Sequence, residues 1–177
     1  MMSAMQNLIG QWLTSLKHYL LMCLLLSSPE RLPYNSSIVL LTGFLYYLVG
    51  LMLVDAAHGY ELVCAQITLE LFMLGLITYV GLNLRNSLPR FKQTFSALIG
   101  TNAIITALTI PAYRFAIDSS NVDDNMLIYV TLVFLTWNLA VLSLIFKRSF
   151  DISTQLSAMI SFAYFIIFQL TVIWLFS

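Results

Sequence analysis

Five long apolar runs, separated by short polar connections, constrain this chain more than any other feature of its sequence. A helix needs about 20 predominantly apolar residues to cross the hydrocarbon core of a bilayer. The sequence therefore predicts an all-α, polytopic membrane bundle of five transmembrane helices. The predicted crossings are Ser37 to Val54, Leu62 to Leu82, Phe95 to Ala112, Met126 to Phe146 and Gln155 to Phe176.

Composition disfavours the soluble alternative. Hydrophobic residues make up 60% of the chain and charged residues only 9%. A soluble helical bundle needs a polar stripe on each helix, whereas these runs are apolar on all sides. Alternation of apolar and polar residues at period 2, which is typical of a membrane β-barrel, is missing as well.

The basic residues are distributed unevenly along the chain. The N-terminal segment and the connections after the second and fourth runs hold seven of the eight basic residues, and the other connections hold only Arg114. Cytoplasmic connections of membrane proteins are enriched in Lys and Arg. We therefore expect the N-terminus in the cytoplasm and the C-terminus on the opposite side. The shortness of the connections favours the inner membrane of a bacterium.

The segment before the first run has the pattern of an amphipathic helix. From Met5 to Cys23, apolar residues recur at steps of three and four, and polar residues fill the other face. One interpretation is a helix in the cytoplasmic interface with Trp12 among the headgroups. The other is a helix that packs its apolar face on the spans or on a partner. Pro29 and Pro33 end it, so the chain divides into residues 1–34 and a transmembrane domain of residues 35–177.

A single acid, Glu70, lies in the middle of the second run. Gln66 is one helical turn before it, and three other runs each carry one amide near mid-depth, namely Asn102, Asn138 and Gln169. These side chains are expected to form an intramembrane polar cluster. Three roles stay open: a hydrogen-bonded knot that fixes helix register, a path for protons, ions or a small polar solute, and contact with a polar residue of a partner subunit.

The third run carries a stripe of small residues that predicts close helix packing: Ser96, Gly100, Ala103 and Ala107. Small residues at this spacing let two helix backbones approach each other. This run is therefore expected at the centre of the bundle. Pro111, near its outer end, should kink or end the helix.

Residues that could contact lipid headgroups or a partner lie at the predicted cytoplasmic side. They are Trp12, Lys17, Arg85, Arg90, Lys92, Lys147 and Arg148. Their spread over three segments is what membrane orientation produces, so we expect no nucleic-acid partner. The stretches "DAAHGYE" and "DSSNVDDN" are interpreted as solvated loops rather than metal sites. We find no catalytic motif and expect no cofactor, no metal and no enzymatic activity.

Three stretches resemble the Yip family, the Ypt/Rab-interacting membrane proteins, in its short bacterial form. They are "LLLSSPERLP", "LPRFKQTFSALIG" and "WNLAVLSLIFKRSFDIS". The resemblance implies a five-span helical protein with its N-terminus in the cytoplasm, and it supplies no catalytic residues. We therefore expect a non-enzymatic scaffold, accessory subunit or membrane organiser, with lipids and another membrane protein or a second copy as partners. The alternative is a small channel or transporter built around Glu70.

Overall fold

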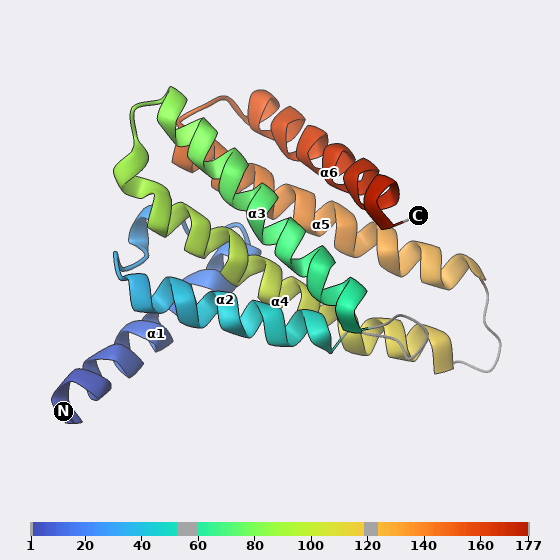
Figure 1. Cartoon of the computed structure of the whole chain (residues 1–177), viewed down its shortest axis with the longest axis horizontal. Helices are drawn as coiled ribbons and strands as arrows, with labels where there is room; N and C mark the ends of the chain where they lie inside the picture. The colour runs from blue at the N-terminus through green and yellow to red at the C-terminus, as the bar shows by residue number, and fades with distance from the viewer. Residues whose placement is uncertain (1, 53–59, 119–123, 177) are drawn as a thin grey trace.

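The computed structural model describes residues 2–52, 60–118 and 124–176, and over these residues the backbone forms six α-helices, two short 3-10 turns and no strand (Figure 1). The helices are α1 (Met2–Cys23), α2 (Ser36–Leu51), α3 (Tyr60–Leu84), α4 (Phe91–Asp118), α5 (Asp124–Phe150) and α6 (Thr154–Phe176), and the turns are η1 (Pro29–Arg31) and η2 (Leu88–Arg90). The all-α prediction is confirmed.

Four of the predicted crossings form helices that are long and apolar enough to cross a membrane, namely α3 to α6. The chain therefore has the character of an integral membrane protein. The first predicted crossing corresponds to α2, which is equally apolar but has only 16 residues. The remainder of that run, residues 53 and 54, lies outside the described part of the chain.

Helix α4 is the centre of the bundle. It packs against α1, α2, α3 and α5, whereas α6 packs on α5 and α3 at the periphery. Ala97 and Leu98 of α4 are completely buried in the main apolar core, together with Leu74 of α3 and Phe146 of α5. Pro111 does not end this helix, which continues to Asp118. Pro111 was expected either to kink or to end the helix, and the second of these expectations is therefore wrong.

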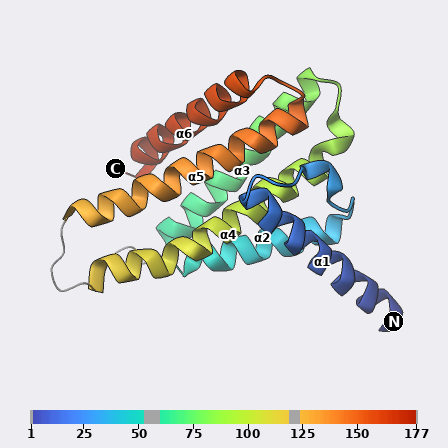
Figure 2. The same cartoon turned by 180° about the vertical axis from the view of Figure 1, so that it is seen from behind.

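The C-terminal half of α1 is built into the bundle. Tyr19, Met22 and Cys23 are buried in the core shared with α4 and α5. The indole Nε1 of Trp137 donates a hydrogen bond of 2.8 Å to the backbone oxygen of Cys23. Of the two interpretations of the amphipathic pattern, packing on the spans therefore describes this half, while the N-terminal end projects away from the bundle (Figures 1 and 2).

Three helices end in the same way. Leu25, Asn86 and Asp151 follow α1, α3 and α5 and have φ of 64°, 54° and 51°. After each of them, a backbone N–H bonds the carbonyl oxygen five residues earlier, for example Ser87 to Leu82 at 2.8 Å. This is the Schellman pattern, in which a left-handed residue stops the helix and satisfies its last carbonyl groups. Each of these three caps therefore reverses the direction of the chain within a short connection.

The tight connections meet at one end of the bundle. Arg90 Nη1 in η2 forms a salt bridge of 2.8 Å with Glu30 Oε1 in η1. Arg85 Nη2, after α3, donates a hydrogen bond of 3.2 Å to the backbone oxygen of Asp151, after α5. The α1–α2, α3–α4 and α5–α6 connections therefore contact one another, and the C-terminus lies toward the opposite end (Figure 2).

Candidate functional site: the Glu70 cavity

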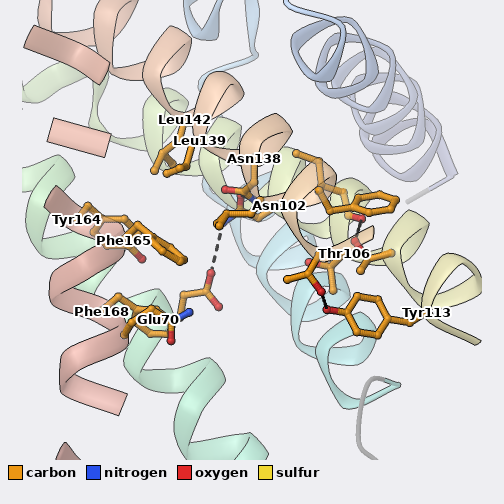
Figure 3. Close-up of a pocket in the computed structure, with 16 residues that line it drawn as sticks. Glu70, Asn102, Thr106, Tyr113, Asn138, Leu139, Leu142, Tyr164, Phe165 and Phe168 are labelled. Carbon is orange, nitrogen blue, oxygen red and sulfur yellow. Dashed lines mark hydrogen bonds between the residues drawn. The ribbon is translucent and has the colours of Figure 1, made fainter. Parts of the chain in front are cut away.

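A chain of polar side chains connects the middles of α3, α4 and α5. Asn102 Nδ2 donates a hydrogen bond of 3.4 Å to Glu70 Oε1, and Asn138 Nδ2 donates one of 3.2 Å to Asn102 Oδ1 (Figure 3). Each of the three residues lies near the middle of its helix. Side chains that are 32 and 36 residues apart in sequence thus share one hydrogen-bonded chain inside the bundle.

A fourth helix contributes a residue that the sequence analysis missed. Tyr46 of α2 is buried, and it lines a cavity together with Glu70. Tyrosines of membrane helices favour the two interfaces. Tyr46 instead lies in the middle of its apolar run. That departure from the interfacial pattern was the available indication of a polar partner inside the bundle.

Glu70 opens onto a cavity of about 370 Å³ between α3, α4, α5 and α6 (Figure 3). One wall of this cavity is a polar stripe along α4, formed by Asn102, Thr106, Thr109 and Tyr113. Steps of three and four place these side chains on one helix face. The stripe leads from mid-helix toward the end opposite the basic connections, where Tyr113 hydrogen-bonds Thr131 of α5.

A second cavity, of about 300 Å³, is also lined by Glu70, together with residues of α2 such as Tyr46 and Gly50. The two cavities share Glu70, Asn102, Thr106, Asn138 and Phe168. Among the predicted cluster residues, Gln66 lines the second cavity and the exposed Gln169 lines the first. All five members of the predicted cluster therefore lie around these two cavities, and three of them form the hydrogen-bonded chain.

The apolar lining of the first cavity comes mainly from α5 and α6, and on the α6 side Tyr164, Phe165 and Phe168 lie beside Glu70 (Figure 3). Within the described residues, the Tyr164 hydroxyl is the one buried side-chain polar atom that has no hydrogen-bond partner. A buried polar group left without a partner costs about 1 to 3 kcal/mol. The site therefore has unused hydrogen-bonding capacity beside its carboxyl group.

Among the described residues, no basic side chain lines the Glu70 cavity as a counterion. Over the described part of the chain, the salt bridge found is Arg90–Glu30, at the end of the bundle. The hydrogen-bond donor to Glu70 is instead the neutral amide of Asn102, which adds no charge. The described residues also contain no group of three His, Cys, Asp or Glu side chains that could hold a metal ion. The arrangement can bind and orient a polar group.

The small-residue stripe of α4 packs against two different elements. Ser96 and Gly100 are buried against α1: the Tyr19 hydroxyl hydrogen-bonds Ser96, and the Tyr19 ring lies over Gly100. Ala103 packs instead on the smaller apolar cluster between α2 and α3. Ala107 is exposed.

The residues predicted to contact lipid or a partner are divided between the bundle end and its surface. Arg85, Arg90 and Arg148 line one cavity at the bundle end. Lys92 lies over the Tyr34 ring at 4.8 Å from its centroid. Lys17 and Lys147 are exposed, and Trp12 is partly buried. Asp55 and His58 of "DAAHGYE", and residues 119–123 of "DSSNVDDN", lie outside the described residues.

Comparison of the chain with known protein families, with curated proteins and with solved structures found no match.

Proposed function

We propose that this chain is a non-enzymatic integral membrane protein of the Yip-like type, with five crossings, that serves as a scaffold, accessory subunit or membrane organiser. The observation that carries this proposal is the apolar outer surface of the bundle. Phe72 of α3, Val133 of α5 and Trp174 of α6 have 66%, 64% and 82% of their surface exposed. Exposed apolar area of this extent favours contact with lipid or with another membrane helix.

The fifth crossing in this proposal is α2. Although it has 16 residues, it packs along α4 and α3, which are of spanning length. A bilayer accommodates a short apolar helix by local thinning or by association of that helix with its neighbours. The N-terminal half of α1, which carries Trp12, then lies in the cytoplasmic interface of a bacterial inner membrane.

The test is to crosslink the protein in intact membranes, purify it in mild detergent and measure the mass of the complex. We expect a defined assembly, either with a second membrane protein or with further copies of this chain. Phe72→Ser and Val133→Ser, on separate exposed faces, should identify the contact face by weakening that assembly. A monomer with no reproducible crosslinked partner would contradict the scaffold and accessory roles.

A second candidate function, passage of a small polar solute, is favoured by the polar stripe that leads from Glu70 to Tyr113. Five crossings lack the paired inverted repeats that many transporters use, so an oligomer would have to complete the path. The experiment is solute and proton flux into proteoliposomes. Glu70→Ala should abolish flux, whereas Glu30→Gln, which removes a carboxylate outside the cavity, should not. Equal flux through the wild type, Glu70→Ala and Glu70→Gln would exclude this function.

A further inference from the structure

A third polar cavity lies at the end of the bundle where the three connections meet. Its volume is about 390 Å³, and most of its lining is polar. The lining residues come from η1, from the ends of α3 and α5, and from η2: Glu30, Arg85, Ser87, Arg90, Arg148, Ser149, Phe150 and Asp151. Three guanidinium groups and two carboxylates therefore surround one small space, which gives the lining a net charge of +1.

The carboxylates of the protein neutralise only part of the positive charge of this cavity. Arg90 is paired with Glu30 at 2.8 Å. Arg85 donates to a backbone carbonyl oxygen, that of Asp151 at 3.2 Å, which does not neutralise its charge. Arg148 is partly buried, and within the described residues Arg90–Glu30 is the salt bridge that forms. Arg85 and Arg148 therefore line this cavity without a salt bridge to Glu30 or Asp151 among the described residues.

We infer that this cavity binds the phosphodiester group of an anionic phospholipid headgroup. Guanidinium groups match phosphate oxygens geometrically, because their N–H donors form parallel pairs of charge-assisted hydrogen bonds. A phosphodiester carries one negative charge, which balances the +1 of the lining. The cavity also lies where α3 and α5 end, at the depth that headgroups occupy around a bundle of spanning helices, and basic pockets between such helices bind acidic headgroups.

Of the basic residues predicted to contact lipid or a partner, this inference assigns lipid binding to three, namely Arg85, Arg90 and Arg148. A purely structural role is the competing explanation, because a cation near a helix C-terminus also stabilises the last carbonyl groups. The two explanations differ in what they require. Helix capping concerns the stability of the free protein, whereas phosphodiester binding requires a selective and saturable ligand. The inference needs the bundle to sit in a bilayer, but it does not need the scaffold role.

The experiment measures retained phospholipid by native mass spectrometry of the full chain in mixed micelles. Equal amounts of phosphatidylglycerol and phosphatidylcholine are offered to the wild type, Arg148→Gln, Arg85→Gln and Lys147→Gln. Lys147 is the matched control, since it precedes Arg148, is exposed and lies outside the cavity lining. We expect selective retention of one phosphatidylglycerol, a loss of about tenfold in Arg148→Gln and Arg85→Gln, and a change of less than about twofold in Lys147→Gln.

Arg148→Lys keeps the charge and removes the guanidinium fork, so it should lose part of the affinity even if Arg148→Gln does not fold. Equal losses in Lys147→Gln and Arg148→Gln would overturn the inference, because binding would then follow net charge alone. Retention that is unchanged in both arginine variants would overturn it as well. Displacement of phosphatidylglycerol by millimolar inorganic phosphate would assign the cavity to a soluble anion and remove the lipid as its ligand.

Discussion

At Glu70, a carboxyl group inside a helical bundle accepts a hydrogen bond from a neutral donor on another helix, Asn102 of α4. Inserting an acid at the centre of a membrane helix costs about 2.5 to 3.5 kcal/mol on the translocon scale. The many apolar residues of the same run offset this cost. The hydrogen bond is therefore not needed for insertion, and we expect its effect to be on the register of α3 against α4.

A double-mutant cycle measures this effect for one pair. Glu70→Ala and Asn102→Ala should show a coupling free energy of about 0.6 to 1.7 kcal/mol for unfolding, the range found for hydrogen bonds between membrane helices. Asn83→Ala combined with Glu70→Ala is the control, because Asn83 is exposed on the same helix and lies outside the cavities. A coupling of zero for Glu70 and Asn102 would show that their contact does not stabilise the fold.

Two glycines give a second test at the scale of single residues. A methyl group added at Gly100 would lie 2.7 Å from the Tyr19 ring, whereas one added at Gly43 has no atom within 4 Å. Gly100→Ala should therefore lower the free energy of unfolding by about 1 to 3 kcal/mol through overpacking. Gly43→Ala should be neutral or stabilising, because alanine favours the helix. Thermal unfolding in detergent measures both, and equal effects would contradict the packing of α1 on α4.

At the scale of elements, α1 shows how far a hydrophobic pattern can predict structure. The spacing of apolar residues from Met5 to Cys23 predicts the helix and its apolar face. It does not predict what covers that face, because bilayer and protein interior both accept apolar side chains. The covering residues, Gly100 and Trp137, are 81 and 114 residues away from their contacts at Tyr19 and Cys23. Contacts at that separation depend on the packing of the whole bundle.

The end of α1 provides a prediction at this scale. Leu25 has φ of 64°, a left-handed conformation that costs a residue with a Cβ about 1 to 2 kcal/mol. Leu25→Gly should relieve this cost and stabilise the protein by a net amount of about 0.5 to 1 kcal/mol. Leu26→Gly is the control: Leu26 is exposed and its φ is not positive, so this change should destabilise. The midpoint of thermal unfolding checks both, and a lower midpoint for Leu25→Gly would contradict this interpretation.

Part of the candidate site, the polar cluster around Glu70, could also be predicted from the sequence. One acid and three amides at mid-run depth indicate an inward-facing cluster, because lipid offers them no partner. Glu70, Asn102 and Asn138 do share hydrogen bonds. Tyr46 was missed, and so was the difference between these three residues and the exposed Gln169. Both depend on how each helix is rotated about its axis, which apolar runs with no polar face do not specify.

At the scale of the whole molecule, the two ends of the bundle have different chemistry. One end gathers Arg85, Arg90 and Arg148 around a polar cavity, and the polar stripe of α4 leads toward the other end. Lys and Arg of short connections are retained on the cytoplasmic side of a membrane. From this rule we predict that the arginine cavity lies on the cytoplasmic side of the membrane and that the polar stripe of α4 leads toward the opposite side.

The most direct test of the account is the location of the two chain ends in the membrane. Fusions at each end, with green fluorescent protein as the cytoplasmic reporter and alkaline phosphatase as the reporter of the opposite side, distinguish five crossings from four. Five crossings, with α2 among them, predict fluorescence at the N-terminus and phosphatase activity at the C-terminus. Fluorescence at both ends would place them on one face, exclude α2 as a crossing and contradict the proposed topology.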